Sequence, residues 1–348
     1  MEIPKRSGGV RLLGIPTVED RIAQMTVRMS FEPKVEQIFH ENSFGYRPGK
    51  SALEAVGLTR KRCWKYDWAI ELDIKGLFDN IDHELLMSVV NKHATERWEI
   101  LYIKRWLKVA MQMPNGEKLE RGKGTPQGGV ISPVLANLFM HYAFDRWMET
   151  QWEKTPWVRY ADDAIIHCRT EHETKEILRR LNLRLKRCKL ELHPTKTKIV
   201  YCKDKDRKGE YPNTEFTFLG YTFKGQWIKD RLGRIQCNFI ASVSKAAVQA
   251  MRDTIRSWKV KRHSGSDINS LSERYNAILR GWFTYYGKYC ASAMAVIAKY
   301  FNQCLARWVM FTYRRFRRNK RKAVSWLQEV ARRTPELFVH WEKGYTPS

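Results

Sequence analysis

Two adjacent carboxylates stand inside an apolar segment, "WVRYADDAIIHC" at residues 157–168, where Asp162 and Asp163 separate two β-like runs. Like charges this close repel each other, and burying even one of them is unfavourable without a compensating positive charge. The ordinary explanation is a hairpin tip, because Asp tolerates turn geometry and bonds to its own backbone. Taken alone, the pair favours that explanation.

A second segment carries the same signal and changes the interpretation. In "WAIELDIKGLFDNIDHELL", residues 68–86, an apolar strand ends at Asp73 and is followed by a turn and a helix. Carboxylates at neighbouring strand ends, here Asp73, Asp162 and Asp163, would form a site for hard divalent cations, which prefer oxygen ligands. Two such ions about 4 Å apart stabilise the attacking and leaving oxygens of a phosphoryl displacement. We therefore predict two Mg²⁺ ions, with Mn²⁺ as a substitute.

A glycine-rich loop lies between the two acidic segments. In "GKGTPQGGVISPVLANL", residues 122–138, Gly128 and Gly129 would let backbone N–H groups approach a ligand closely before an apolar helix begins. Many such loops are merely turns, so this one carries little weight by itself.

The elements that must position these residues alternate along the chain. β-like runs at residues 68–74, 157–167, 197–202 and 216–223 are separated by segments with helical spacing of apolar residues. This alternation predicts an α+β or α/β layer in which helices cover one face of a sheet. After residue 240 the pattern is almost wholly helical. We therefore divide the chain into residues 1–235 and 236–348.

The net charge narrows the choice of partner. The 348 residues include 63 Lys and Arg against 37 Asp and Glu, which gives a formal charge of +26. From residue 240 onward, 21 Lys and Arg face only 6 Asp and Glu. Such an excess disfavours a compact fold unless a polyanion offsets it. Nucleic acid is the first candidate and an acidic membrane surface the second, although no apolar run reaches the roughly 18 residues that span a bilayer.

Cysteine usage indicates a reducing compartment. The seven cysteines lie far apart and include no C-x-x-C pair. This spacing argues against zinc and against a disulfide framework, and it favours reduced thiols in a cytoplasmic protein. The N-terminal residues lack the long apolar core of a signal peptide.

Together these segments resemble a known family. Residues 160–163 (Tyr-Ala-Asp-Asp), with Asp73 and Phe78 upstream and the G-T-P-Q-G-G stretch between, are similar to the palm of a reverse transcriptase. The chain in particular resembles group II intron-encoded reverse transcriptase/maturases. Further blocks similar to that family follow in the family's order, at residues 3–21, 43–53, 193–200 and 216–223. The basic region beyond 240 is similar to the thumb/maturase domain, so the resemblance covers nearly the whole chain.

The resemblance implies a fold and an activity. It implies a right-hand-like polymerase, with partial fingers and an antiparallel palm sheet with helices on one face in residues 1–235. An all-α, basic thumb/maturase domain would follow in residues 236–348. The activity implied is RNA-directed DNA synthesis, in which a primer 3′-hydroxyl on an RNA template attacks a dNTP. The protein would also bind its intron RNA and assist splicing and mobility.

The same resemblance assigns roles to individual residues. Asp73, Asp162 and Asp163 would be the catalytic, metal-holding carboxylates. Phe78 would lie beneath the incoming sugar and exclude a 2′-hydroxyl. The other nucleotide-binding residues would be Lys5, Arg11, Gln127 and either Lys196 or Lys198.

Two features of the family are missing from this sequence. The first block normally follows several dozen further residues, whereas Met1 stands immediately before it here. We therefore expect an N-terminally truncated chain with incomplete fingers and weakened template binding. Nothing after the thumb resembles an HNH endonuclease, so we expect no cleavage of a second DNA strand.

Basic residues in the second part are expected to bind RNA. In residues 242–259 a basic stripe lies beside the apolar stripe of one predicted helix, and residues 314–322 hold seven Lys or Arg. Such groups contact phosphates, which fixes position without reading sequence. The aromatic residues within 282–286 either stack on bases or pack the helical core, and packing is favoured for each. The predicted RNA-binding residues are Lys245, Arg252, Arg256, Lys259, Arg314, Arg315, Arg317, Arg318, Lys320, Arg321 and Lys322.

A rival function is an RNA-binding maturase, or an inactive remnant, that keeps the palm only as a scaffold. The retained aspartates argue for the enzyme, whereas the missing N-terminal segment argues for the rival. The sequence leaves open whether the protein forms a homodimer.

Overall fold

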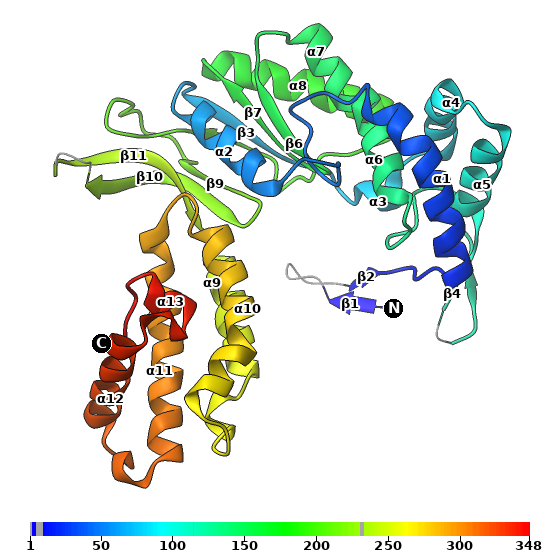
Figure 1. Ribbon diagram of the computed structural model, residues 1–348. Helices are drawn as coiled ribbons and strands as arrows, with labels where there is room; N and C mark the ends of the chain where they lie inside the picture. Colours follow the sequence, from blue (N-terminus) through cyan, green and yellow to red (C-terminus); the bar gives the residue numbers. More distant parts are fainter. Residues whose placement is uncertain (1, 5–9, 114, 230–232) are drawn as a thin grey trace. The chain divides into compact units, whose positions relative to one another are not determined.

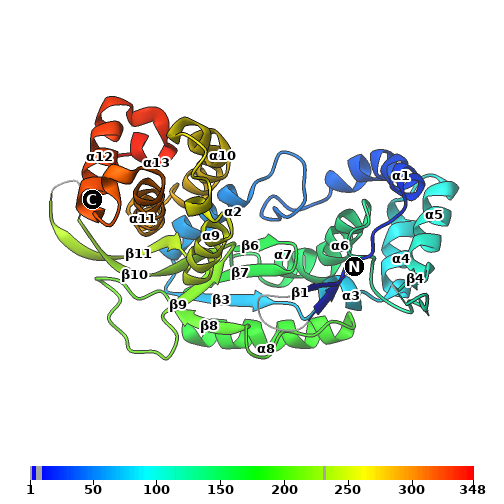
Figure 2. The same ribbon diagram turned by 90° about the horizontal axis from the view of Figure 1, so that it is seen from below.

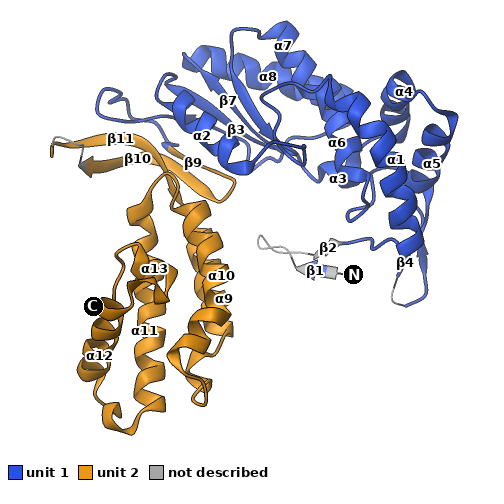
Figure 3. Ribbon diagram, in the orientation of Figure 1, with its two compact units in different colours: residues 1–214 blue, residues 215–348 orange. Residues whose placement is uncertain are grey.

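The computed structural model describes residues 2–4, 10–113, 115–229 and 233–348 (Figure 1). The chain forms two compact units, residues 1–214 and 215–348 (Figure 3). This division falls before residue 235, because the strands that follow Thr214 pair with one another and not with the first sheet. The functional boundary at residue 235 stays a prediction.

The first unit contains a four-stranded sheet, two short hairpins and eight α-helices within the described residues. Its elements are β1 (Glu2–Pro4), β2 (Val10–Leu12), α1 (Val18–Glu36), α2 (Ala52–Cys63), β3 (Trp68–Asp73), α3 (Leu77–Asn80), α4 (His83–His93), α5 (Arg97–Lys108), β4 (Met111–Gln112), β5 (Lys118–Leu119), α6 (Ser132–Met140), the π-helix η1 (His141–Asp145), α7 (Arg146–Gln151), β6 (Trp157–Tyr160), β7 (Asp163–Cys168), α8 (Glu171–Arg187) and β8 (Lys198–Tyr201).

The central sheet has the strand order β6–β7–β3–β8, and each neighbouring pair is antiparallel. The predicted strand regions at 68–74, 157–167 and 197–202 are thus confirmed. β3 lies in the middle because its residues Trp68–Leu72 are nearly all apolar, which suits a strand flanked by two others. The fold is mixed α and β with an antiparallel sheet, as expected.

Helices cover one face of this sheet and part of the other. α8 packs against β3 and β7, and Figure 2 shows it running along the strands. It does so because Ile177, Leu181 and Leu185 recur on one stripe of the helix and are all buried. α2 packs against β6 and β7 from the opposite face, where Cys63 Sγ lies 4.0 Å from His167 Nδ1.

The second unit begins with a three-stranded antiparallel sheet and continues as helices. β11 is paired with β10 along its whole length and therefore extends to Val243, later than the residue at which the sequence predicts helices to begin. The elements are β9 (Glu215–Phe218), β10 (Tyr221–Lys229), β11 (Ile235–Val243), α9 (Lys245–Ser257), η2 (Val260–Arg262), α10 (Ile268–Tyr286), η3 (Ala291–Met294), α11 (Ala295–Thr312), η4 (Arg314–Phe316), α12 (Lys320–Arg333), η5 (Pro335–Leu337) and α13 (Val339–Glu342).

α9 of this unit has the predicted amphipathic pattern. Met251 and Ile255 are buried in the helical core, with Ala247 one turn earlier. Residues 259–267, between α9 and α10, form η2 and the turns around it. None of the seven cysteines, all of which lie within the described residues, forms a disulfide.

Candidate active site and nucleic-acid interface

The predicted acidic residues meet at one end of the central sheet. Asp73 is the last residue of β3 and Asp163 the first of β7, and the two are direct cross-strand partners. Partners of this kind have Cα atoms about 4.5–5.5 Å apart. Asp162 belongs to the turn that joins β6 to β7, where Ala161 adopts a left-handed φ of 57°. Carboxylates about ninety positions apart in sequence therefore converge.

Strand alternation places a fourth carboxylate on the same face. Glu71 lies two residues before Asp73 in β3, so both side chains project to the same side of the sheet. Lys198 of β8 is the cross-strand partner of Glu71, and its Nζ lies 3.2 Å from Glu71 Oε2. Sequence reasoning missed Glu71, although the spacing E-x-D in "WAIELDI" contains the signal.

The electrostatics of the site reflect too little positive charge. Burial is the main cause that raises the pKa of Asp163 from 3.8 to about 7, and the charges of Asp162 and Asp73 raise it further. The one opposing cation that acts on Asp163 strongly is Lys196. Its Nζ bonds to Asp73 Oδ2 at 2.7 Å, from a side chain that is about half exposed. The carboxylates thus exceed their counter-charge.

The donor set suits a hard divalent cation, although it is not preassembled. Within the parts of the chain that the structure describes, no three His, Cys, Asp or Glu side chains are placed so that they could hold a metal ion. Asp73 is instead ion-paired with Lys196. Oxygen donors with excess negative charge are nevertheless the ligands that Mg²⁺ prefers.

The glycine-rich loop is fastened to the segment that carries Phe78. The backbone N–H of Thr125 donates to the carbonyl of Phe78 at 2.6 Å, and that of Gly124 donates to Ile81 at 2.7 Å. A Cβ on Gly124 would lie 2.6 Å from the Phe78 carbonyl oxygen, so only glycine permits this approach. Gln127 Nε2 bonds to Asp79 Oδ1 at 2.8 Å. Phe78 and Gln127 are therefore brought together, and their roles stay predictions.

The predicted hairpin at the N-terminus is present in part. β1 and β2 are antiparallel, and Arg11 of β2 is opposite Ile3. Lys5 lies outside the described residues, and the side chain of Arg11 is not described either.

Sequence reasoning also missed an aromatic side chain next to the site. Tyr46 has a left-handed φ of 58° and is exposed. Its ring lies 6.4 Å from that of Phe78 and 6.2 Å from that of Tyr160, measured between centroids. Backbone conformations of this kind are unfavourable for a bulky residue and often occur at functional positions. The flanking glycine and Arg-Pro-Gly in "FGYRPG" are the signal that could have found it.

The predicted RNA-binding residues lie in the second unit, and ten of the eleven are exposed. The seven basic residues of 314–322 are all exposed, in η4, at the start of α12 and in the segment between them. Arg256 is exposed but bonds to Asp253 at 2.6 Å. Arg252 differs, because it is half-buried with its guanidinium 5.7 Å from the centre of the Tyr300 ring. The surface is strongly cationic, and RNA contact stays a prediction.

The aromatic residues of α10 pack within the unit. Phe283 is buried, and Trp282 stacks on Trp258 with centroids 5.7 Å apart. Tyr285 donates its hydroxyl to the Leu219 carbonyl at 2.9 Å. Packing, the favoured alternative, is therefore what the structure shows for these residues.

The fold and the site define the class of protein. The structure is similar to apo telomerase from Candida tropicalis, with a TM-score of 0.55 and 12% identity over 99% of this chain and 67% of that one. A second telomerase structure from that organism, truncated from the C-terminal domain, gives a TM-score of 0.50 at 14% identity over 64% of this chain and 52% of the other. At such identities the likeness concerns the fold, which is that of reverse-transcriptase-like polymerases.

Sequence similarity then identifies the family. Residues 3–223 match the profile described as reverse transcriptase (RNA-dependent DNA polymerase), and residues 248–326 match the group II intron, maturase-specific domain. The chain belongs to the reverse transcriptase family and carries the maturase-specific domain of group II introns after its polymerase region. The resemblance noted in the sequence is thereby confirmed.

Curated relatives support the same family. The group II intron-encoded protein LtrA of Lactococcus lactis subsp. cremoris is 38% identical over 39% of this chain, and the match spans 23% of that protein. Protein YkfC of Escherichia coli K12 is 30% identical over 74% of each chain. An uncharacterized 91 kDa protein in the cob intron of Schizosaccharomyces pombe is 26% identical over 82% of this chain and 42% of its own length. Among the described helices, none combines the length and apolar character needed to cross a bilayer.

Proposed function

We propose that this protein is an active RNA-directed DNA polymerase of a group II intron, extending a primer 3′-hydroxyl with dNTPs on an RNA template. The observation that carries the proposal is the cross-strand pairing of Asp73 with Asp163, beside Asp162 in the adjoining turn. Asp73, Asp162 and Asp163 would hold two Mg²⁺ ions, which stabilise the attacking and leaving oxygens of an in-line phosphoryl displacement when bound. Mn²⁺ would substitute.

Lys196 is the lysine that we assign to the triphosphate. Lys198 lies within β8 and pairs with Glu71, whereas Lys196 precedes the strand, is about half exposed and bonds directly to Asp73. Once the charge of Asp73 is neutralised, the Lys196 ammonium is free to bind the triphosphate and to donate a proton to the leaving pyrophosphate. Lysine binds phosphates as a point charge, which suits this mobile position.

Other residues of the first unit would select and hold the nucleotide. Phe78 would lie beneath the sugar and exclude a 2′-hydroxyl, so that dNTPs are preferred. Gln127 would line the pocket, because its loop is fastened to the helix that carries Phe78. Lys5 and Arg11 would grip the triphosphate from the N-terminal hairpin.

The basic residues of the second unit would bind intron RNA and so assist splicing and mobility. Seven exposed basic residues within 314–322 supply phosphate contacts, and the maturase-specific match covers the whole of that segment. Phosphate contacts of this kind are independent of sequence and sensitive to salt. Cysteines that form no disulfide fit the cytoplasm as the compartment. No homodimer is needed for the site, since the residues proposed for it lie in one chain.

The second candidate is an RNA-binding maturase in which the palm is only a scaffold. The Lys196–Asp73 ion pair favours it, because an ammonium at 2.7 Å from the carboxylate competes with a cation. The same basic surface would then be the functional part of the chain.

Primer extension on an RNA template with dNTPs and Mg²⁺ separates the two. The active polymerase predicts extension that falls at least about 100-fold in Asp162→Asn, since even residues that only support a metal ligand contribute 10–100-fold. Glu191→Gln is the matched control, because it removes an exposed carboxylate whose ion pair among the described residues is with exposed Lys75. RNA binding without extension in the wild-type protein would favour the scaffold.

A further inference from the structure

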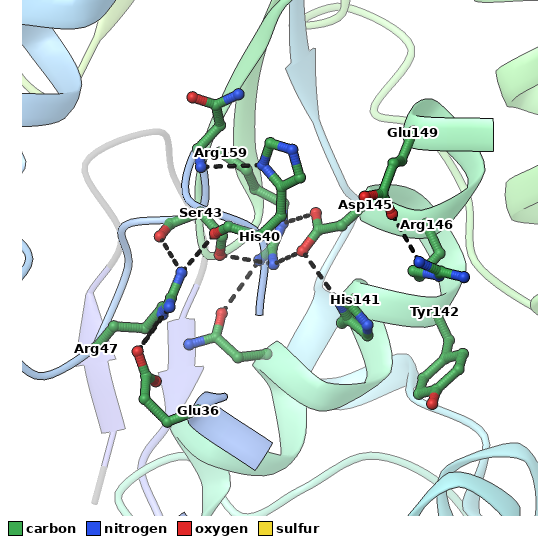
Figure 4. Close-up of polar contacts among 12 residues, drawn as sticks. Glu36, His40, Ser43, Arg47, His141, Tyr142, Asp145, Arg146, Glu149 and Arg159 are labelled. Atoms are coloured by element: carbon green, nitrogen blue, oxygen red, sulfur yellow. Dashed lines mark hydrogen bonds and ion pairs between the residues drawn. The ribbon is translucent and has the colours of Figure 1, made fainter. Parts of the chain in front are cut away.

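A buried arginine stands immediately before the acidic turn, in the segment "RYADD". Arg159 is 0% exposed and belongs to β6. Its guanidinium has five N–H donors, and five bonds to protein acceptors are present. Figure 4 shows those to Asp145 and Ser43. The acceptors are Asp145 Oδ1 at 2.7 Å, Asp145 Oδ2 at 2.6 Å, Ser43 Oγ at 2.8 Å, Asn137 Oδ1 at 3.1 Å and the Ala161 carbonyl at 3.1 Å.

The last of these bonds reaches the turn that carries Asp162. Ala161 has a φ of 57°, a conformation that costs an L-residue roughly 1–2 kcal/mol and that therefore needs support. Arg159 donates to the carbonyl of that residue, so the bond fixes the peptide that leads into Asp162. The left-handed turn is thus stabilised by a hydrogen bond from a charged donor, the Arg159 guanidinium.

The other side of the turn is held by the loop around Gly45. A Cβ on Gly45 would lie 2.5 Å from the Ala161 nitrogen, so the loop and the turn are in direct backbone contact. Asn137 Nδ2 donates to the Gly45 carbonyl at 2.6 Å while its Oδ1 accepts from Arg159. The backbone of Phe44 also donates to the Arg159 carbonyl at 2.8 Å. Arg159 and Asn137 therefore link both sides of the turn.

Stability alone does not account for this arrangement. An ion pair buried as completely as Arg159–Asp145 is often no more stabilising than apolar residues of similar volume. The guanidinium provides hydrogen bonds of fixed direction, because its donors are arranged in a planar fork. Neighbouring His141 adds no competing charge, since burial lowers its pKa to about 4.

We propose that Arg159 is a positioning residue, which sets the place of the Asp162 carboxylate by bonding to the Ala161 carbonyl while anchored to Asp145, Ser43 and Asn137. This rests on the proposed polymerase function for its kinetic consequence. The residue does not touch substrate. It acts through the turn, so its loss changes the rate of the chemical step and the cation requirement more than it changes nucleotide binding.

The test compares Arg159→Lys with Arg184→Met. Lysine keeps the positive charge opposite Asp145 but cannot supply five directed donors. Arg184 of α8 is the control, because it is an arginine that donates to the carbonyls of Tyr142 and Ala143 and, among the described residues, makes no hydrogen bond to the turn. Asn137→Ala serves as a second, uncharged variant if the lysine variant does not fold.

The readouts are kcat, KM for dNTP, the Mg²⁺ concentration for half-maximal extension, and Mn²⁺ binding followed by electron paramagnetic resonance. In Arg159→Lys we expect kcat to fall about 10- to 100-fold, as for a displacement of about 1 Å. The KM for dNTP should change less than twofold, whereas the Mg²⁺ requirement should rise at least fivefold. In Arg184→Met all three should match the wild-type protein, measured per folded molecule.

The outcomes separate this proposal from the proposed function. A folded Arg159→Lys or Asn137→Ala protein with wild-type kcat and Mg²⁺ requirement overturns the positioning role. If the wild-type protein binds Mn²⁺ but does not extend primers, the polymerase proposal fails alone. In that case Mn²⁺ should bind at least fivefold more weakly to Arg159→Lys than to the wild-type protein if Arg159 is a positioning residue. Unchanged Mn²⁺ binding overturns the positioning role. A wild-type protein that neither extends primers nor binds Mn²⁺ overturns both proposals.

Discussion

Replacing Asp163 by asparagine is expected to stabilise the metal-free protein. Burial and the charges of Asp162 and Asp73 raise the pKa of Asp163 from 3.8 to about 7 in the folded state. Between these two values the folded protein binds more protons than the unfolded chain, so the free energy of unfolding falls as the pH rises. Asparagine has nearly the same shape and no charge, so the variant does not show this fall.

The magnitude follows from the size of the shift. Each pKa unit corresponds to about 1.4 kcal/mol, so a fully ionised Asp163 would destabilise the folded protein by up to ~4 kcal/mol above pH 7. Water reaches this partly exposed carboxylate and screens its charge, so we expect about 2 kcal/mol. For a unit of this length that difference corresponds to a Tm higher by roughly 4–8 °C at pH 8. At pH 4 the difference should vanish.

Calorimetry with EDTA at pH 4, 6 and 8 measures this effect. Glu191→Gln is again the control, because that carboxylate is exposed and outside the cluster. Adding Mg²⁺ should then raise the Tm of the wild-type protein and leave that of Asp163→Asn unchanged, since only a folded site binds the ion. A variant that is less stable than the wild-type protein in EDTA at pH 8 would refute the reasoning, as would an equal difference at pH 4 and pH 8.

Three further outcomes can be measured. Phe78→Ala should raise incorporation of rNTPs relative to dNTPs by at least about 10-fold, because an aromatic ring next to the sugar would no longer exclude the 2′-hydroxyl. An unchanged ratio of rNTP to dNTP incorporation in competitive extension would show that Phe78 does not select the sugar. Replacing Arg314, Arg315 and Arg317 by alanine should weaken the salt dependence of RNA binding. The slope of log K against log salt should become shallower by about 2, at roughly 0.7 per lost phosphate contact. An unchanged slope in filter binding would show that these residues make no phosphate contact. His340 is buried, and burial lowers its pKa to about 3. As the pH falls below 6.5 the unfolded chain therefore takes up a proton before the folded one, and the free energy of unfolding of the second unit should fall by about 1.4 kcal/mol per pH unit. In urea unfolding this pH dependence should be weaker in His340→Gln, and an equal pH dependence in both proteins would contradict the lowered pKa of His340.

The sequence predicts the central sheet and its acidic end well, for a physical reason. Short, mostly apolar runs define β3, β6, β7 and β8, and two separate runs of this kind that each end in a carboxylate are harder to explain by turn chemistry than one. The pairing of Asp73 with Asp163 follows once the strands are neighbours, and the family resemblance supplies that adjacency.

What the sequence could not decide depends on register and on packing. Whether Lys196 or Lys198 reaches the site depends on which residue of β8 is opposite Glu71, and this is set by pairing between strands far apart in sequence. Arg252 has the spacing of an exposed basic residue, yet it folds over Tyr300 because the adjacent helix offers an aromatic face. The strand β11 was missed although apolar residues alternate along Ile235–Val243, and its pairing with β10 continues to Val243.

The π-helix η1 has a consequence for how insertions and deletions would be tolerated. Residues eight positions apart on a regular α-helix point about 80° away from each other, yet Asn137 and Asp145 both bond to Arg159. The wider turn at His141–Asp145 absorbs that angular offset, as single π turns inside α-helices do. Removing one residue there would rewind the segment into an ordinary helix and swing Asp145 off the guanidinium. Insertions and deletions within His141–Asp145 should therefore disturb the bonds to Arg159 far more than substitutions on the outer surface of this segment.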